Sequence, residues 1–597
     1  MTHRSTSGGV VLLRRAWLPL LLLVATSWTQ AQLTSGTSTS ATSPTSTSAS
    51  APQATCGPSG TGQTACGGDG VASQNLNEVD AGAGNPIHLI TGNKYQREED
   101  LPALPGVLGL EIVRHYNSQF SRLSTPNGIM GRGWKLSYET RLYPGEVSLQ
   151  VVQADGARII FSKDPLHPSV CTTSDPSQGQ IKVIKSPQGR RYEWIWPSGK
   201  VLSFNAQGRL TQILAPTGEF VSLQYSGTGL LVSVTDPQNR SLRLNYLDSR
   251  EAAKREKFTG VVSIDTPVGR FAYEYGSAKP QGSQITDREL RANLVKVNLP
   301  TRYNPDEQAH PLTQRGTTSS TLSRLYHYED ARWPTLLTGI SVQATGQAGQ
   351  LSRQRLATWG YDVNGQGILS EYPGTGGHRL QFDRRQPGQT VITDAQGRQT
   401  TYTHAIVQGH YRLLESRGAG CTPCSPANQR YRYDSQARLT HQIDLNAQGQ
   451  AVRGWRFYPD HQGRTLATAM LVFDTQGQAR EHIVEQRQYQ GDSPWPVVVR
   501  TPSVVQGRWR EQRWSYNAQG QPTRVVQTGW VPALPQGAAG TGGTVEPQPI
   551  QPLKREVSYS YQRINNRSVL VAVDGPLPGT ADTRRYVWDK RGDFVST

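Results

Sequence analysis

Most of the chain consists of short stretches in which apolar and polar residues alternate, separated by turn residues. One such stretch is Val221-Ser222-Leu223-Gln224-Tyr225. Alternation with a period of two is typical of a strand with one buried face. Turn residues recur at short intervals, because 60 Gly and 38 Pro are spread over 597 residues. The pattern therefore predicts a mainly β fold built from many short strands.

A short motif recurs where these stretches end: an aromatic residue, Asn or Asp, two variable residues, and Gly or Ala. Complete copies lie at 204–208, 361–365, 433–437, 473–477, 516–520 and 588–592, and copies without the aromatic residue lie at 394–397 and 446–449. The Asx side chain can accept hydrogen bonds from backbone N–H groups two residues on, and Gly takes a positive φ at little steric cost. Together they predict a type I turn followed by a bulge, which is a common hairpin connection.

In this motif the chain resembles the YD repeats of the Rhs family, which also occur in insecticidal toxin-complex proteins and in animal teneurins. The resemblance covers roughly residues 190–597. It implies stacked β-hairpins that form a curved or spiral sheet, as a partial Rhs-type shell. Stacking also has a physical reason, because a single hairpin is marginally stable and stacked hairpins cover each other's faces and edges.

A second resemblance lies at residues 85–145, ahead of the repeats. It is carried by Asn85 to Tyr95, Glu99-Asp100-Leu101, Arg114 to Ser118, Gly131 to Trp134 and Ser137-Tyr138. In that order these residues are similar to the small β domain that often precedes the repeats in bacterial Rhs proteins. Taken by themselves they predict strands with glycine turns and buried Tyr and Trp. We expect Asn93, Arg114 and Asn117 to satisfy backbone groups rather than to bind a ligand.

The amino-terminal end has the composition of an export signal. Arg14 and Arg15 precede a short apolar core, which predicts a signal peptide at 1–31 and a periplasmic, cell-surface or secreted location. Residues 33–55 are almost entirely Ser, Thr, Ala and Pro, too polar to offset chain entropy, so residues 32–84 are expected to form a disordered Ser/Thr/Gly-rich tether. No later segment is apolar for long enough to predict a stable membrane span.

The other domain boundaries are set by the limits of the two resemblances and by the Pro/Gly-rich composition of residues 531–553. We expect an Rhs-associated amino-terminal β domain at 85–189, a YD-repeat array at 190–530, a Pro/Gly-rich loop at 531–553 and terminal repeats at 554–597. A short helix is expected at 248–258, with Asp248 or Ser249 as its cap. Because the chain stops within a repeat, the array is expected to be incomplete.

The chain has a formal charge of +17, which raises the question of an anionic partner. The basic residues are spread out, without a run of five or six, and no nucleic-acid motif accompanies them. Solvated strand faces explain the charge better than a nucleic-acid groove. Aromatic faces stack on sugar rings and Arg binds acidic groups, so binding of cell-surface carbohydrate stays an alternative.

The five cysteines predict local disulfides rather than a redox or zinc site. Cys421-Thr422-Pro423-Cys424 is a CxxC, but a redox pair would stand at a helix start within a βαβ unit, and this one precedes a strand and turn. A local disulfide that pins a loop is the expectation. Cys56 and Cys66 could close a small loop, and Cys171 is left over. One CxxC does not predict a zinc site.

No pattern predicts a catalytic residue, a cofactor or a metal. Residues 57–64 mimic a phosphate-binding loop, but Gln63 stands where a Lys is required. Arg591-Gly592-Asp593 could be an adhesion tripeptide, yet it falls on an expected repeat turn. The nucleophile and zinc motifs GxSxG and HExxH do not occur. We therefore expect a protein that is not an enzyme, and an enzyme with a site that only the fold could reveal stays a minor alternative.

Taken with the export signal and the lack of a catalytic motif, the resemblance implies an exported, non-catalytic scaffold from a Gram-negative bacterium, part of a shell or carrier in bacterial competition or surface interaction. Its expected partner is a second chain that completes the repeat shell, or a toxin cargo. Full Rhs proteins carry a conserved segment around Asp-Pro-x-Gly that plugs the shell and acts in cleaving off a toxin. We do not find that segment here, so self-cleavage and type VI delivery are not carried over.

Overall fold

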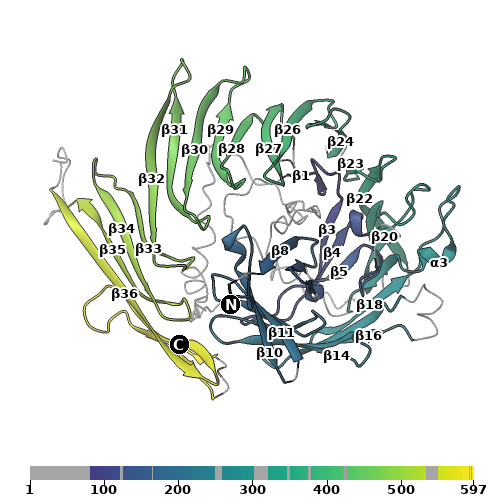
Figure 1. Ribbon diagram of the computed structural model, residues 1–597, viewed down its shortest axis with the longest axis horizontal. Helices are drawn as coiled ribbons and strands as arrows, with labels where there is room; N and C mark the ends of the chain where they lie inside the picture. Colours follow the sequence, from purple (N-terminus) through teal and green to yellow (C-terminus); the bar gives the residue numbers. More distant parts are fainter. Residues whose placement is uncertain are drawn as a thin grey trace, which may run out of the picture. The chain divides into compact units, whose positions relative to one another are not determined.

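The protein is described here from a computed structural model. It covers residues 81–121, 126–163, 166–187, 189–248, 258–300, 321–345, 350–373, 378–421, 424, 426–532, 549–590, 592 and 594–597. Strands make up 56% of the structure and helices 3%, so the prediction of a mainly β fold is confirmed (Figure 1). The expected signal peptide, the tether up to residue 80, Cys56 and Cys66, and nearly all of the expected helix lie outside the described residues. No helix among the described residues is long and apolar enough to cross a membrane.

One antiparallel sheet of 33 strands contains most of the fold, and each strand pairs with its neighbours in the chain (Figure 1). Its first half comprises β6 (Arg141–Pro144), β7 (Ser148–Val152), β8 (Arg158–Lys163), β9 (Val170–Thr172), β10 (Gln180–Ser186), β11 (Gly189–Ile195), β12 (Val201–Phe204), β13 (Leu210–Leu214), β14 (Phe220–Tyr225), β15 (Leu231–Thr235), β16 (Ser241–Tyr246), β17 (Val261–Thr266), β18 (Gly269–Tyr275), β19 (Leu294–Asn298), β20 (Thr321–His327), β21 (Gly339–Thr345) and β22 (Leu351–Tyr361).

The second half of the sheet continues in the same order. It comprises β23 (Gly367–Glu371), β24 (Arg379–Asp383), β25 (Gln389–Thr393), β26 (Gln399–Val407), β27 (His410–Gly418), β28 (Gln429–Tyr433), β29 (Leu439–Leu445), β30 (Ala451–Pro459), β31 (Thr465–Phe473), β32 (Ala479–Tyr489), β33 (Pro496–Pro502), β34 (Trp509–Tyr516), β35 (Pro522–Pro532), β36 (Ile550–Ile564), β37 (Arg567–Asp574) and β38 (Arg584–Arg585). No described ladder joins β38 to β6, so the sheet is open. Since β35 and β36 reach Pro532 and Ile550, strands occupy both ends of the loop expected at 531–553.

The strands before β6 form a separate group, called here the amino-terminal block (residues 81–121 and 126–140). It contains β1 (Gly82–Ala83), β2 (Ile87–His88), β3 (Tyr95–Leu101), β4 (Ile112–Asn117) and β5 (Trp134–Leu136), with 3-10 turns at Ser118–Ser121 and Ser137–Glu139. The long sheet begins at Arg141 and is continuous past residue 189. The division into domains at residue 189 stays a prediction.

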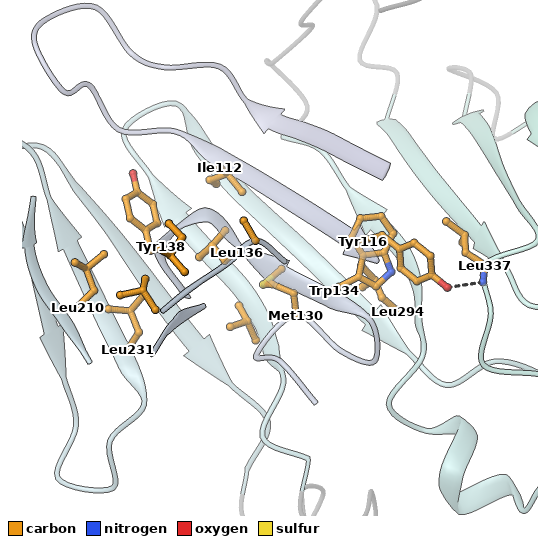
Figure 2. Close-up of a cluster of buried hydrophobic side chains, with 14 of the residues drawn as sticks. Ile112, Tyr116, Met130, Trp134, Leu136, Tyr138, Leu210, Leu231, Leu294 and Leu337 are labelled. Carbon is orange, nitrogen blue, oxygen red and sulfur yellow. Dashed lines mark hydrogen bonds between the residues drawn. The ribbon is translucent and has the colours of Figure 1, made fainter. Parts of the chain in front are cut away.

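The main core lies between the amino-terminal block and the long sheet. Figure 2 shows Tyr116 and Trp134 of the block beside Leu294 and Leu337 of the sheet region, and all four side chains are buried. The Tyr116 hydroxyl accepts a hydrogen bond from the Leu337 N–H at 2.9 Å (Figure 2). Burying a large apolar side chain contributes about 1.5–3 kcal/mol, so the block and this part of the sheet stabilise each other.

The repeat turn has the geometry that the motif predicts. In the copy at 204–208, Asn205 Oδ1 accepts hydrogen bonds from the N–H groups of Gln207 and Arg209 at 3.1 and 3.0 Å. The N–H of Gly208 returns to the Asn205 carbonyl at 2.9 Å, the φ of Gly208 is +72°, and the register shifts at Phe204. These are the features of a type I turn with a bulge. The predicted hairpin connection is therefore confirmed.

An arginine after the turn adds an ion pair that the motif did not predict. Arg438 donates to the Asp434 carboxylate at 2.7 Å within its own turn, and also to the Asp460 carbonyl of the next turn at 2.6 Å. Asp460 pairs in turn with Arg464, which donates to the Gly491 carbonyl at 2.7 Å. The arginines thus connect successive turns along one border of the sheet.

Two repeat glycines give a matched test of this geometry. Gly208 and Gly397 share a φ near +75° (+72° and +77°), but a Cβ on Gly208 would stand 1.7 Å from the Leu142 carbonyl oxygen, whereas nothing lies within 4 Å of a Cβ on Gly397. We expect Gly397→Ala to cost about 1 kcal/mol from backbone strain alone. Gly208→Ala should cost about 1–3 kcal/mol more, because β6 must move away. Urea unfolding of the two variants measures the difference, and equal losses would contradict it.

Candidate functional site

A buried network of charged side chains joins the amino-terminal block to the long sheet. Arg114 on β4 binds Asp100 on β3 through two hydrogen bonds, Nε to Oδ2 at 2.6 Å and Nη2 to Oδ1 at 2.8 Å, and both side chains are fully buried. Two hydroxyls of the sheet complete the site: Tyr326 lies 2.6 Å from Arg114 Nη2, and Tyr273 donates to Asp100 at 3.1 Å. The site therefore ties β3 and β4 to β18 and β20.

A second ion pair balances the charge of this network. Arg324 Nη1 lies 3.2 Å from Glu98 and 3.3 Å from Asp100, so two carboxylates face two guanidinium groups. Although burial disfavours its charge, the adjacent Asp100 holds the pKa of Arg114 above its ordinary value. The guanidinium also lies over the Trp134 ring, 4.7 Å from its centroid. These contacts are those of an anchor between two parts of the fold.

The three polar residues singled out in the sequence behave in two ways. Asn93 and Asn117 each accept a hydrogen bond from the backbone N–H of Gln119, as expected. The expectation was wrong for Arg114, which binds a carboxylate and a tyrosine hydroxyl instead of backbone groups. Its partner Asp100 lies within the same stretch, 85–145, that carries the second resemblance, but nothing in the spacing signalled the pair.

A second anchor lies around β2. The guanidinium of Arg384 donates to the carbonyls of Leu89 and Gly367 at 2.7 Å each and to that of His88 at 3.1 Å. Burial lowers the pKa of Arg384 to about 10. Burial, with Arg384 and His404 nearby, also lowers the pKa of His88 to about 3. The neutral His88 ring accepts hydrogen bonds at Nδ1 from the N–H groups of Ile90 and Thr91, both at 3.2 Å.

A serine and a histidine meet in the amino-terminal block, which raises the question of a nucleophile. His115 Nε2 lies 3.2 Å from Ser137 Oγ, and His115 Nδ1 lies 2.8 Å from the Tyr95 hydroxyl. The Ser137 hydroxyl donates to the Val113 carbonyl at 3.1 Å. With Tyr95 donating to Nδ1 and Nε2 donating to Ser137, each proton in this chain has an acceptor. In this arrangement the imidazole does not accept the Ser137 proton, as a general base would.

The expected local disulfide is present between Cys421 and Cys424. It lies between β27 and β28, where Cys424 forms an isolated β-bridge with Ala83 of β1. The disulfide thus holds a loop of the long sheet against the amino-terminal block. Cys171 is a buried free cysteine.

A cleft of about 750 Å³ opens beside Trp333. Its walls come from five separate segments, and the lining side chains include Gln119, Gln284, Glu289 and Arg332. The indole N–H of Trp333 donates to the Asp362 carbonyl at 2.8 Å, which fixes the ring at the repeat turn 361–365. No sequence signal could have found this cleft, because the fold brings its segments together from 118 to 365.

The other candidates from the sequence carry no site in the described part of the chain. No group of three or more His, Cys, Asp or Glu side chains there could hold a metal ion. The phosphate-loop mimic at 57–64, together with Arg591 and Asp593, lies outside the described residues. Gly592 has a φ of +82° and its N–H donates to the Asp589 carbonyl at 3.0 Å, as in the other repeat turns.

Comparisons with known proteins match two parts of the chain. Residues 84–161 match the family model of DUF6531, a domain of unknown function, and residues 204–241 match the model of the RHS repeat. Among solved structures, the chain is similar to a Tc holotoxin pore from Photorhabdus luminescens, at 11% identity and a TM-score of 0.29 over 86% of this chain and 27% of that one. It is also similar to TcdB2–TccC3 without the hypervariable C-terminal region, at 11% identity and a TM-score of 0.30 over 81% of this chain and 27% of that one.

The chain spans less than a third of the length of those structures. At such TM-scores the likeness carries no argument, so the assignment rests on the two family models and on the repeat turns themselves. Both models match in chain order, and the RHS match begins at Phe204, the first residue of a repeat turn with the predicted geometry. The chain therefore contains a segment that matches the RHS repeat and, ahead of it, a segment that matches the DUF6531 domain.

Proposed function

We propose that this protein is an exported scaffold whose uncovered strands hold a partner chain or a cargo. The observation that carries the proposal is the change in burial along the sheet. In the described residues after Leu471, the buried apolar side chains are those of Pro496, Val498, Val525, Val569 and Tyr586, whereas the strands that contact the amino-terminal block bury many. Strands β32 to β37 therefore bury few apolar side chains on either face.

The uncovered strands are also polar and charged. Arg500 and Arg513 flank Glu511 at 2.5 Å each, and Arg524 pairs with Glu556 across the adjacent strands. Exposed ion pairs of this kind contribute little to stability. They supply hydrogen-bonding groups for a polar protein surface, so we favour a protein partner over a lipid one. Export from a bacterial cell and a role in competition or surface interaction belong to this proposal, and catalysis does not.

A site-specific photo-crosslinker tests the partner. A benzoylphenylalanine in place of Trp509, which is 38% exposed on β34, should give a discrete adduct of higher mass in the producing cell. The same group in place of Val147, which is 80% exposed in the β6–β7 turn, is the matched control and should give none. Equal labelling at both positions, or none at either, would contradict a partner on the uncovered strands.

Fractionation of the producing cells tests export separately. We expect the full chain outside the cytoplasm, shortened by the residues up to about position 31, because a signal peptide is cleaved on translocation. Mass spectrometry of the purified chain identifies its first residue. An uncleaved chain confined to the cytoplasm would contradict export while leaving the scaffold role to the crosslinking experiment.

A further inference from the structure

The scaffold role does not use the cleft beside Trp333. The cleft lies where the turn before β21, the repeat turn 361–365, the loop around Gln284 and the 3-10 turn at Ser118–Ser121 meet. Its volume, about 750 Å³, falls within the range of small-molecule sites. We propose that this cleft binds an uncharged sugar, such as a hexose unit of a glycan. The proposal goes beyond the scaffold role and does not depend on it.

The aromatic wall of the cleft is held in place before any ligand arrives. The Trp333 N–H is bound to the Asp362 carbonyl at 2.8 Å, and a Cβ on Gly365 would be 3.5 Å from the indole ring, so the turn packs against it. The ring therefore offers apolar surface to the cleft rather than its polar group. A fixed aromatic surface suits the C–H face of a sugar ring and loses little conformational entropy on binding.

The charged groups of the cleft are already paired. Arg332 donates to the Asp330 carboxylate at 2.8 Å and to the Tyr361 carbonyl at 2.7 Å. The Glu289 carboxylate accepts hydrogen bonds from the N–H and the hydroxyl of Thr286 at 2.8 and 2.7 Å, which lowers its pKa. One acid and one base, each satisfied locally, give the cleft no net attraction for a charged ligand.

Two of the polar side chains that line the cleft are glutamine amides. The side chains of Gln119 and Gln284 line the cleft and make no hydrogen bond to another described residue. A side-chain amide offers donors and an acceptor together, which matches a hydroxyl group that both donates and accepts. An aromatic surface with two amides is a set of groups that recognises a polyhydroxylated, uncharged molecule.

Calorimetric titration of the full chain with cellobiose, maltose, lactose and diacetylchitobiose tests the proposal. We expect saturable binding of at least one disaccharide, weakened about tenfold or more by Trp333→Ala and unchanged by Trp509→Ala, a change at an exposed Trp on β34. Gln284→Ala should weaken binding several-fold, while Gln476→Ala, at an exposed repeat turn, should not. Thermal unfolding of each variant checks that the fold is intact.

Three outcomes would overturn the proposal. One is the absence of binding by all four sugars at concentrations up to about 50 mM. Another is unaltered affinity in Trp333→Phe and Trp333→Ala alike. The third is salt-sensitive binding of an acidic sugar such as glucuronate alone, which would place the interaction on the basic surface instead.

Discussion

Replacing Arg114 by Met should destabilise the protein by about 3–5 kcal/mol, because the buried carboxylates of Asp100 and Glu98 are then left with Arg324 as their shared cation. The direct partner of Arg114 is Asp100, whose side chain is fully buried together with that of Arg114. The same change also removes the contact with Tyr326 on the long sheet. Urea unfolding followed by tryptophan fluorescence measures the loss, and the amino-terminal block should become protease-sensitive at lower urea.

An exposed pair of the same residue types is the control. Arg385 and Asp383 also form a close ion pair, but their side chains are 89% and 41% exposed. Arg385→Met should leave the unfolding midpoint unchanged, because water replaces the lost partner. The double variant Arg114→Met/Asp100→Asn should recover part of the loss, since no carboxylate is then left without a cation. If Arg114→Met costs no more than Arg385→Met, the network is not an anchor.

Acid should weaken the fold by about 5 kcal/mol between about pH 7 and pH 4.5, with the buried His88 and the half-buried His115 as the main cause. Burial, reinforced by Arg384 and His404, lowers the pKa of His88 from 6.5 to about 3. Burial, reinforced by Arg97, lowers that of His115 likewise. The unfolded chain binds both protons below pH 6.5 and the folded chain does not. The stability is therefore complete above pH 6.5 and is lost as the pH falls towards 3.

Two substitutions separate the histidines from other titrating groups. Asn at position 88 keeps an acceptor for the N–H groups of Ile90 and Thr91, and Gln at position 115 keeps a donor for Ser137. In each variant, the free energy of unfolding measured with urea should fall between pH 7 and pH 4.5 by about half as much as in the wild type. Burial raises the pKa of Glu139, which acts in the opposite sense, so the wild-type profile alone is not decisive. His482→Gln, at an exposed position, should leave the slope unchanged, and a slope unaltered in all three would exclude this mechanism.

The repeat turns could be predicted from the sequence because their chemistry is local. The Asx side chain, the N–H groups that it binds and the left-handed residue all lie within five positions, as in the turn from Asn205 to Arg209. One repeat turn has Ala in place of Gly at its last position. Ala437 takes the left-handed position with a φ of +61° despite its Cβ, in a turn that the pair Asp434–Arg438 also holds.

The anchors and the cleft could not be predicted, because they depend on contacts between residues far apart in the chain. Tyr116 and Leu337 are 221 residues apart, and Arg114 and Tyr326 are 212 apart. Alternation within a strand says which face is buried but not which distant segment covers it. The same reason explains why the sequence placed the start of the repeat array at residue 190, while pairing in the long sheet begins at β6.

The order of strands in the long sheet has a consequence for how the molecule assembles. Because each hairpin is formed by neighbours in the chain, the sheet can grow in the direction of synthesis, one hairpin after another. The strands that precede it pair among themselves, but the residues that cover them lie far ahead in the chain: the Trp134 indole N–H donates to the Tyr328 hydroxyl, 194 residues later. At a synthesis rate of about 5–20 residues per second, that is a wait of about 10–40 s with Trp134 and its apolar neighbours uncovered. During that interval the nascent chain exposes apolar surface on its amino-terminal strands. We therefore expect a molecular chaperone to bind these strands during synthesis.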